Sequence, residues 1–228
     1  MPETYLVTGC SRGLGLEFAR QLKARGDRVL GVLRTQTADA RAACDRVFSL
    51  DVTSPDALSR LQHDLADERV DVLINNAGVS SESRTLDLCT ADELQRVFLV
   101  NATAPVMVVK AVLPALRRGP RRLVVNISSQ LASITNNSGG SSYAYRASKC
   151  ALNMLTTCLA NEFRPDAVAF VAMHPGWVRT DMGGPKAPLS PPESVRAMLA
   201  TIGGPDGTGL GMSRTGSFLN YDGSPLPW

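Results

Sequence analysis

Short apolar runs alternate along the chain with longer stretches in which apolar residues recur every three or four positions. The short runs are typical of buried strands, and the longer stretches are typical of amphipathic helices. We expect strands over residues 5–7, 28–33, 46–50, 70–74, 122–127 and 167–173, with a candidate last strand over 217–219. Because helical stretches separate these runs, the pattern predicts an α/β fold, a doubly wound parallel sheet of about seven strands with helices on both faces.

The helical stretches carry boundary signals. One helix is expected over Leu16–Ala24, and Ser54-Pro55-Asp56 opens another with a capping hydroxyl, a proline and an acid in the first turn. The longest helix is expected from Ala91 through Leu116. Pro105 lacks the amide hydrogen that this helix needs, so we expect a kink or local opening just after Asn101.

Length and composition favour one domain. The 228 residues are 44% hydrophobic, which suffices for one full core. No repeat, linker or change of composition divides the chain, so we expect a single domain over 1–228. A segment rich in Pro and Gly to about Pro192, with a short helix expected after it, suggests a substrate lid at approximately 181–199.

Charge and hydropathy exclude several classes of partner. The chain has 24 basic and 21 acidic residues and a net charge of +3. The four arginines Arg117, Arg118, Arg121 and Arg122 are interpreted as a solvated turn rather than a nucleic-acid patch, because no aromatic side chain interleaves with them. No run approaches the ~18 apolar residues of a membrane span and no leader precedes the first strand, so we expect a cytoplasmic protein with no membrane partner.

Cysteine and histidine spacing gives no metal site. The five cysteines include no CxxC pair, and the two histidines stand alone. We therefore expect reduced thiols and no metal.

A glycine-rich turn, Thr8-Gly9-Cys10-Ser11-Arg12-Gly13-Leu14-Gly15, separates the first strand from the first helix. Gly9 permits the tight turn, Gly13 lets the backbone approach a pyrophosphate, and Gly15 lets the helix pack against the strand. Because the helix then presents free amide groups to an anion, the turn predicts a dinucleotide site.

Two arginines indicate which dinucleotide is bound. Arg34 ends the second strand, where an NAD-binding unit would carry an acid, and Arg12 lies inside the glycine turn. Together they could hold the 2′-phosphate of NADP, or both could be ordinary surface arginines. Asp51, at the end of the third strand, is either a turn residue or an acceptor for the adenine amino group.

The other strands also end in polar or small residues. Asn75-Asn76-Ala77-Gly78 follows the fourth strand, where small residues let the chain pass close under a nucleotide and Asn75 could instead tie strands together. Ser128-Ser129 follows the fifth strand and Pro175 the sixth. Because the carboxyl ends of parallel strands line one crevice, we expect these residues to converge.

Tyr145 and Lys149 lie four positions apart at the start of a predicted helix, so they share one face. A free phenol has a pKa near 10, and lowering it to about 7 takes roughly 4 kcal/mol. One positive charge about 4 Å away, at an effective dielectric near 20, supplies roughly that amount. The pair therefore predicts a proton-transfer site, although the same spacing also occurs in ordinary helices.

In order along the chain, these pieces resemble the short-chain dehydrogenase/reductase family. They are Thr8-Gly9-x-x-x-Gly13-x-Gly15, Asn75-Asn76-Ala77-Gly78, Asn101, Ile127-Ser128-Ser129, Tyr145-x-x-x-Lys149 and Pro175-Gly176. The ordered set covers Thr4 to Thr180 and is far more specific than any one motif. The segments 143–149 and 174–185 and the closing Pro227-Trp228 are similar to the C-factor and sniffer-like carbonyl reductase branch, which implies a Rossmann fold.

The resemblance implies a catalytic set of Asn101, Ser129, Tyr145 and Lys149. Tyr145 would donate a proton to the substrate carbonyl, Lys149 would lower the Tyr145 pKa and hold the nicotinamide ribose, and Asn101 would position a water. Ser129 would hydrogen-bond the substrate oxygen, where negative charge develops.

The choice of serine leaves two rivals. Ser128 directly precedes Ser129, and the loop between Ser129 and Tyr145 is longer than in most members, which keeps Ser133 as an alternative. Tyr143 is treated as a packing or substrate-contact residue.

The resemblance also implies that the cofactor is NADP(H). The residues expected to contact it are Gly9, Ser11, Arg12, Gly13, Leu14, Gly15, Arg34, Asp51, Val52, Asn76, Ala77, Gly78, Tyr145, Lys149, Pro175, Gly176, Val178 and Thr180. NADPH favours reduction, so we expect a reductase of small or medium aldehydes or ketones. Candidate pocket walls are Leu131, Ile134, Trp177, Met182 and Leu189.

Two other functions stay open. A C-factor-like signalling or regulatory protein would bind the dinucleotide with little turnover. An epimerase or dehydratase is disfavoured, because such relatives usually carry a longer C-terminal substrate domain. Helical segments 102–116 and 148–163 are where relatives pair, so a homodimer or homotetramer is expected.

Overall fold

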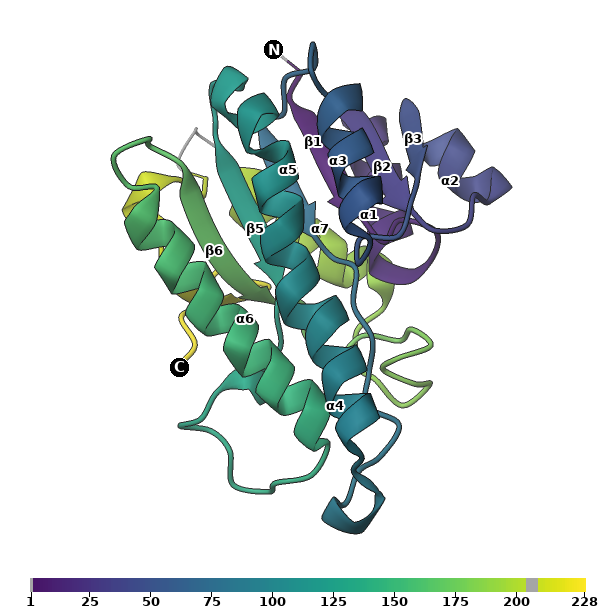
Figure 1. Ribbon diagram of the computed structural model, residues 1–228, viewed down its shortest axis with the longest axis vertical. Coiled ribbons are helices and arrows are strands. Elements are labelled where there is room, and N and C mark those ends of the chain that lie inside the picture. Colours follow the sequence, from purple (N-terminus) through teal and green to yellow (C-terminus); the bar gives the residue numbers. More distant parts are fainter. Residues whose placement is uncertain (1, 204–208) are drawn as a thin grey trace.

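Seven parallel strands form one sheet in the order β3-β2-β1-β4-β5-β6-β7 in the computed structural model, which describes residues 2–203 and 209–228 (Figure 1). The doubly wound parallel sheet is therefore confirmed, and each strand lies within two residues of its predicted bounds. The strands are β1 (Thr4–Thr8), β2 (Arg28–Leu33), β3 (Arg46–Ser49), β4 (Val72–Asn75), β5 (Leu123–Ile127), β6 (Ala169–His174) and β7 (Ser217–Asn220).

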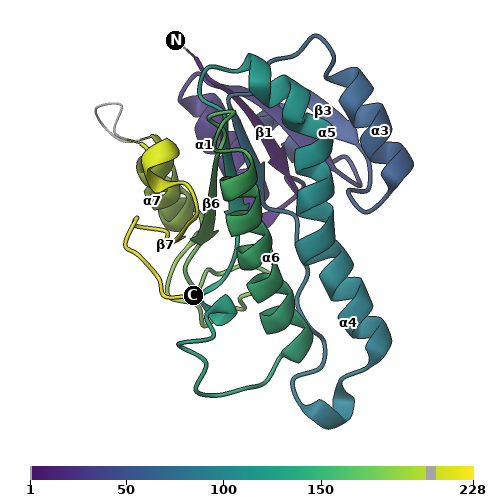
Figure 2. The same ribbon diagram turned by 60° about the vertical axis from the view of Figure 1, so that its left-hand side comes forward.

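Helices cover both faces of this sheet (Figures 1 and 2). One face buries an apolar cluster against α1 (Gly13–Ala24), α2 (Ala38–Ala43) and α7 (Pro191–Gly203). The other face packs against α3 (Pro55–Asp64), α5 (Ala104–Arg118) and α6 (Tyr143–Glu162). Both surfaces of the central strands are dry, which explains why these strands read as continuous apolar runs in the sequence.

The short helix α2 is absent from the sequence prediction. It has six residues, of which only Ala40 and Ala43 are buried. Two alanines make too weak an apolar stripe to be recognised by periodicity, whereas the Thr37 hydroxyl that accepts from the Ala40 amide is a cap that the sequence does contain.

The opening expected after Asn101 is present. The long helical stretch consists of α4 (Ala91–Phe98), one π-helical segment η2 (Leu99–Thr103) and α5. Pro105 occupies the second position of α5, where its missing amide hydrogen removes a bond from the turn before it. The wider turn carries Asn101, which is fully buried.

The same stretch corrects the expectation that no segment is apolar enough to cross a membrane. Residues Ala91–Arg118 contain an 18-residue window of mean hydropathy 1.8, half of which is buried inside the protein. Its buried residues, such as Val108 and Val112, pack against the sheet in the second apolar cluster. A core helix of this kind meets the same criteria of length and composition as a helix that spans a membrane.

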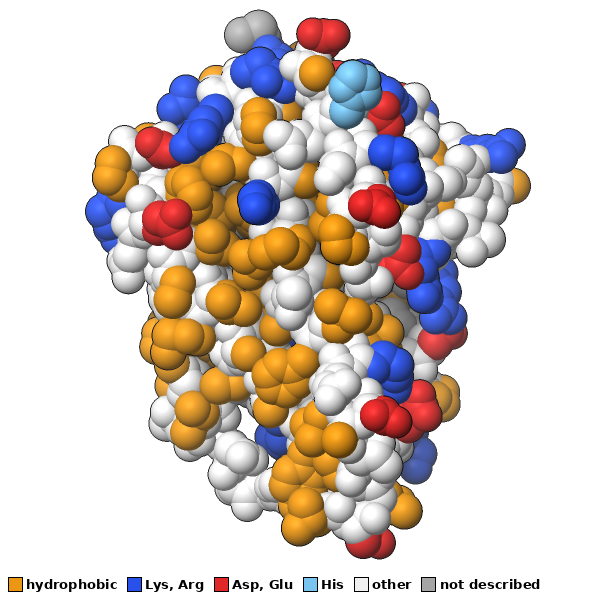
Figure 3. All heavy atoms as spheres, in the orientation of Figure 1, with side chains coloured by type: hydrophobic (Ala, Val, Ile, Leu, Met, Phe, Trp, Pro, Cys, Tyr) orange, Lys and Arg blue, Asp and Glu red, His pale blue; other side chains and the backbone are white. Residues whose placement is uncertain are grey.

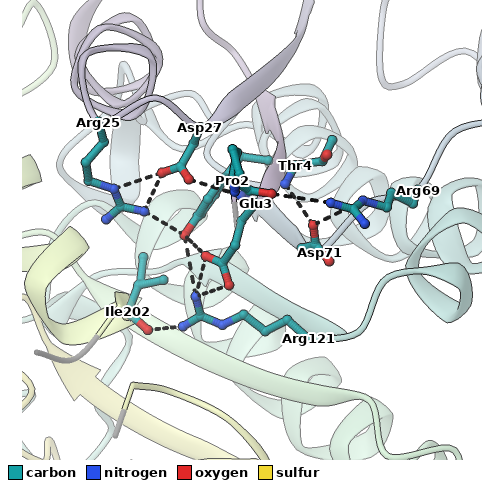
Figure 4. A network of polar contacts seen from close by, with 10 residues as sticks. Pro2, Glu3, Thr4, Arg25, Asp27, Arg69, Asp71, Arg121 and Ile202 are labelled. Atoms are coloured by element: carbon teal, nitrogen blue, oxygen red, sulfur yellow. Dashed lines mark hydrogen bonds and ion pairs between the residues drawn. The ribbon is translucent and has the colours of Figure 1, made fainter. Parts of the chain in front are cut away.

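The arginine-rich turn is solvated at Arg117 and Arg118, as expected, and it is also bonded to the protein. Arg121 pairs with both carboxylate oxygens of Glu3, at 2.6 and 2.8 Å, and donates to the Ile202 carbonyl at the end of α7 (Figure 4). Arg117 forms an ion pair with Asp166, and Arg118 donates to carbonyl groups that follow α3. These arginines therefore tie the amino-terminal edge of the sheet to the helices.

The segment predicted as a lid comprises a loop and the start of the short helix that is expected after Pro192. From Pro191 onward the segment 181–199 belongs to α7, whose Val195 and Met198 are fully buried. The range available to a loop over the carboxyl edge of the sheet is therefore 181–190.

Candidate active site

A cavity of about 500 Å³ lies at the carboxyl ends of the strands, next to β1 and β4, where the strand order reverses. Segments far apart in the sequence form its wall. The residues predicted to contact a cofactor that line it are Gly9, Ser11, Arg12, Gly13, Leu14, Arg34, Asp51, Val52, Asn76, Ala77, Gly78, Tyr145, Lys149, Pro175 and Thr180.

The glycine turn has the shape expected of a phosphate-binding turn. Gly9 and Gly13 adopt left-handed backbone angles, with φ of +74° and +57°. A Cβ on Gly15 would lie 2.2 Å from the Gly9 carbonyl oxygen, so this glycine lets α1 pack on the turn and does not line the cavity. Gly9 and Gly13 therefore form a cradle at the cavity, and Gly15 lets α1 pack against it.

The segment after β4 holds this cradle in place. The Thr8 hydroxyl oxygen accepts from the amides of Asn76 and Ala77 at 3.0 and 3.1 Å, and the Asn76 side chain donates to the Thr8 carbonyl at 2.9 Å. Asn75 does not face the nucleotide cavity. Its carboxamide donates to Asn126 on β5 at 2.9 Å, which favours the structural alternative for this residue.

The two arginines lie at the same cavity in different surroundings. Arg34 is exposed, and its positive charge contributes to a lowered pKa of Asp51, whose main causes are hydrogen bonds from the amide and hydroxyl of Thr53. Arg12 forms an exposed ion pair with Asp181 across the cavity. An incoming phosphate would therefore compete with Asp181 for the Arg12 guanidinium.

Tyr145 and Lys149 lie on one face of α6 and both line the cavity. The Lys149 ammonium donates to the Ile127 carbonyl at 2.7 Å, and burial lowers the pKa of Lys149 to about 8. Burial raises the pKa of Tyr145, while a hydrogen bond with Ser129 acts in the opposite direction. The direction is opposite to the one expected from the sequence, because removal of the phenol from water outweighs the other effects in this setting.

Asn101 lies behind the same pair. Its carboxamide exchanges two hydrogen bonds with the backbone of Val79, both 2.9 Å, and donates to the Ser148 hydroxyl at 3.1 Å. A Cβ on Gly78 would lie 3.2 Å from the Asn101 side-chain oxygen and 3.6 Å from the Lys149 nitrogen. The absence of a side chain at Gly78 therefore leaves the space between these two polar groups clear.

The three candidate serines have different partners. Ser128 is buried and donates to Asn153 on α6 at 2.7 Å, so its hydroxyl is already used inside the fold. Ser133 donates to the Trp228 carbonyl at 3.2 Å. Of the three, Ser129 is the one with a contact to Tyr145, although only Ser128 and not Ser129 lines the cavity.

The segment after β6 forms the far wall. Gly176 has a φ of +83°, and a Cβ there would lie 2.4 Å from a Leu189 methyl group. Val178 is buried and bridges to Leu189, so Gly176 and Val178 support the wall without lining the cavity. Pro175 and Thr180 do line it.

Several lining residues were not predicted. They come from strand ends and the loops after them, from α4 and from the π-helical segment, and they are Val32, Leu33, Thr35, Leu50, Thr53, Val79, Arg96, Leu99, Val100, Ile127 and Asp181. Met182, one of the predicted pocket walls, lines the cavity as well. Most of them are next to a predicted residue in the sequence, so they could have been predicted from that neighbour. Arg96, Leu99 and Val100 could have been found from their positions five, two and one residues before Asn101.

Comparison with known proteins agrees with this geometry. A model of the short chain dehydrogenase family matches residues 3–188. The chain belongs to the short-chain dehydrogenase/reductase family. It is 45% identical to the C-signal protein of Myxococcus xanthus over 159 residues, which are 70% of this chain and 93% of that relative.

Solved structures of this family match the whole chain. The carbonyl reductase Sniffer of D. melanogaster superposes with a TM-score of 0.92 and 33% identity, covering 100% of both chains. An NADPH-bound carbonyl reductase from chicken fatty liver superposes with a TM-score of 0.88 and 31% identity, covering 100% of this chain and 99% of the other. The family resemblance expected from the sequence is thus confirmed.

His174, at the end of β6, makes this edge of the sheet sensitive to acid. Burial lowers the pKa of His174 to about 4 from the model-compound value of 6.5. The unfolded chain therefore binds a proton that the folded chain excludes, and stability that is fully present above pH 6.5 is lost as the pH falls toward 4.

We expect a His174→Asn variant to lose less stability than the wild type between pH 7 and pH 4. The difference corresponds to about 3 kcal/mol of unfolding free energy for the shifted pKa. Urea unfolding at several pH values measures it, with His63→Asn on the exposed side of α3 as the control. Equal pH dependence of wild type and His174→Asn would contradict the assignment.

Proposed function

We propose that the protein is an NADP(H)-dependent oxidoreductase that reduces a small or medium aldehyde or ketone to an alcohol. The observation that carries the proposal is the presence of Tyr145 and Lys149 on the wall of the cavity that also contains the glycine cradle. The family uses NAD(P), and Gly9 and Gly13, both with left-handed backbone angles, line the cavity where the turn would approach a dinucleotide phosphate. When bound, the reduced nicotinamide supplies the hydride to the carbonyl carbon.

Tyr145 supplies the proton in this proposal. Its raised pKa keeps the phenol protonated at neutral pH, which suits a donor to the oxygen of a carbonyl under reduction. Ser129 donates to the same oxygen as negative charge develops on it. Tyr145 is left as a phenolate, which needs a nearby positive charge.

Lys149 supplies that charge. With a pKa of about 8 its side chain is mostly an ammonium at pH 7. Among the basic residues that line the described part of the cavity, Lys149 is the one that shares α6 with Tyr145. Asn101 holds the segment that contains Val79, and the clear space at Gly78 would admit a water between Asn101 and Lys149. Such a water would return protons from solvent to the phenolate.

Arg34 and Arg12 support NADP(H) over NAD(H) because Arg34, with no acid beside it, occupies the end of β2 where an acid would accept from the ribose 2′-hydroxyl group. The NADPH-bound relative from chicken is consistent with this preference. The charge of Arg34 already reaches Asp51 at the edge of the cavity.

We expect NADPH to bind more tightly than NADH, and Arg34→Ala to weaken NADPH binding by roughly tenfold or more, since a charge-assisted hydrogen bond is lost. NADH affinity should change little. Fluorescence titration of both cofactors measures this, with Arg20→Ala on exposed α1 as the control. Equal or tighter binding of NADH by the wild type would remove the NADP assignment.

Of the predicted pocket walls Ile134, Trp177 and Met182, only Met182 lines the cavity. The exposed fractions of these three side chains are 74%, 52% and 49%. Because the loop before α7 is limited to 181–190, we infer a small or medium carbonyl compound rather than a large lipid. A panel of aldehydes and ketones, followed by the loss of NADPH absorbance, tests the reaction class.

A signalling or regulatory role is the second candidate, favoured by 45% identity to C-signal. In that case the dinucleotide would be bound with little turnover. Retention of biological activity by a Tyr145→Phe protein that still binds NADPH would favour this role over catalysis.

We also propose a homodimer or homotetramer in the cytoplasm. Figure 3 shows hydrophobic side chains gathered over α5 and α6, and Met107 and Met154 are 40% and 64% exposed. An apolar surface of this kind suits contact with a second copy of the chain. Sedimentation of the purified protein tests the oligomeric state.

A further inference from the structure

The first turn of α6 lacks a cap from its own sequence. Ser142, which precedes the helix, adopts left-handed backbone angles of φ 48° and ψ 48°, and its side chain makes no capping hydrogen bond. The first amide groups of a helix have no partner inside the helix, so a turn without a cap tends to open. Tyr145, the third residue of α6, lies in this turn.

A serine from a distant segment takes over the role of the cap. The Ser81 hydroxyl oxygen accepts a hydrogen bond from the Tyr145 amide at 2.8 Å. Ser81 lies 64 residues earlier in the chain and is half-buried. The acceptor therefore occupies the position relative to the helix that an N-cap side chain normally has, bonding the third amide.

The loop that presents Ser81, residues 79–84, is itself held at both ends. Val79 is bonded to Asn101, as described above. The Glu93 carboxylate accepts from the amides of Glu82 and Ser83, at 2.5 and 3.0 Å, and from the Ser83 hydroxyl.

Glu93 is at a position where a glutamate usually caps its own helix, α4. It lies three residues after Thr90, the N-cap of α4, where a glutamate usually reaches back to the cap amide. Its carboxylate is instead turned to the loop, and the hydrogen bond from Ser83 holds the pKa of Glu93 below its usual value. The loop is thus fixed by an ionised group.

A second contact joins the loop to α6. The Ser142 amide donates to the Arg84 carbonyl at 3.1 Å. The loop 79–84 therefore meets the start of α6 at two points, Ser81 with Tyr145 and Arg84 with Ser142.

We propose that Ser81 is a positioning residue for the reaction: it caps the catalytic helix from outside and fixes the backbone of Tyr145. This inference rests on the proposed function. Ser81 touches neither the cavity nor the reacting atoms and acts through the Tyr145 amide. Since proton transfer depends on the placement of the phenol to within a fraction of an ångström, opening of this turn reduces the productive population.

The test compares Ser81→Ala with Ser81→Thr and with Ser80→Ala. Threonine keeps a hydroxyl that can accept from the Tyr145 amide. Ser80 is an exposed serine in the same loop, and its hydroxyl donates to the Ser81 carbonyl. We expect a roughly fivefold fall in kcat for carbonyl reduction in Ser81→Ala, from loss of an N-cap, with the KM for NADPH within about twofold of wild type. Ser81→Thr should restore most of the rate.

Two further readouts separate positioning from general stability. Amide hydrogen exchange in a peptide covering residues 142–149 should be roughly fivefold faster in Ser81→Ala, and exchange in peptides of the sheet should be unchanged. With NADPH deuterated at the transferred position, the isotope effect on kcat should rise, because the chemical step becomes slower relative to release.

The outcomes are distinct. Unchanged exchange over 142–149 in Ser81→Ala would overturn the inference whatever the activity, and so would a variant that fails to fold while Ser80→Ala folds. An equal fall in kcat for Ser81→Ala and Ser80→Ala would also overturn it. If the wild type reduces no carbonyl compound, the proposed function fails, and the exchange measurement alone still decides whether Ser81 caps α6.

Discussion

Replacing Tyr145 with Phe is expected to lower kcat for carbonyl reduction by about 10³-fold, the range that a positioned general acid contributes. The phenol is the proposed proton donor, and phenylalanine keeps the ring while removing the transferable proton. NADPH should still bind, with a Kd within about threefold of wild type, because the glycine cradle and Arg34 are untouched. Single-turnover oxidation of NADPH with the best carbonyl substrate measures the chemical step.

The neighbouring phenol provides the comparison. Tyr143 is two residues earlier and 42% exposed. Tyr143→Phe should cost less than about threefold in kcat, consistent with a packing or substrate-contact role. A larger loss of kcat in Tyr143→Phe than in Tyr145→Phe would indicate that Tyr143, and not Tyr145, is the general acid.

Replacing Lys149 with Met is expected to abolish most of the activity and, at the same time, to stabilise the protein. Burial lowers the pKa of Lys149 to about 8 from its usual value of 10.5, which corresponds to a cost of about 3 kcal/mol for holding the ammonium at pH 7. Loss of the hydrogen bond to the Ile127 carbonyl offsets part of this. We expect the unfolding free energy at pH 7 to rise by about 1–2 kcal/mol and kcat to fall by roughly 10²-fold or more.

The pH dependence has a definite sign. Between pH 8 and 10.5 the unfolded chain binds a proton at Lys149 that the folded chain has released, so the wild type gains stability as the pH rises through this window. Lys149→Met lacks that gain. Urea unfolding at pH 7 and pH 10 measures both effects, and a less stable methionine variant at pH 7 would show that the buried ammonium is not a stability cost.

The strands and the π-helical segment could be predicted because their sequence signals are local. Strand β2 has the predicted bounds because six consecutive residues are mostly apolar and the turns on either side are clear. Pro105 likewise indicated the opening that became the π-helical segment at Asn101. In both cases the physical cause lies within a few residues of its effect.

Long-range contacts could not be predicted in this way. The pKa of Tyr145 depends on how deeply α6 is buried against other segments, so the sequence estimate, which considered only Lys149, had the wrong direction. The ion pair of Arg12 with Asp181 joins residues 169 apart, and nothing in either local sequence indicates it. The cap that Ser81 provides to α6 is of the same kind, since the serine and the helix meet only in the folded chain.

The start of α7, where the loop over the sheet ends, depends on both local signals and long-range packing. Pro191-Pro192-Glu193 contains the signals of a helix start, with proline in the first turn and an acid after it, and a short helix is expected there after the loop rich in Pro and Gly. Burial of Val195 and Met198 against α1 and the sheet decides for the helix.

The central claim is that hydride from NADPH reaches a carbonyl carbon while Tyr145 protonates the oxygen. The most direct measurement follows deuterium from NADPH, labelled at the transferred position, into the alcohol product by mass spectrometry. We predict a singly deuterated alcohol from the wild type with at least one small or medium aldehyde or ketone, and at most a trace from Tyr145→Phe at equal cofactor saturation. Labelled alcohol formed equally well by Tyr145→Phe, or by neither protein with any carbonyl although NADPH is bound, would contradict the account.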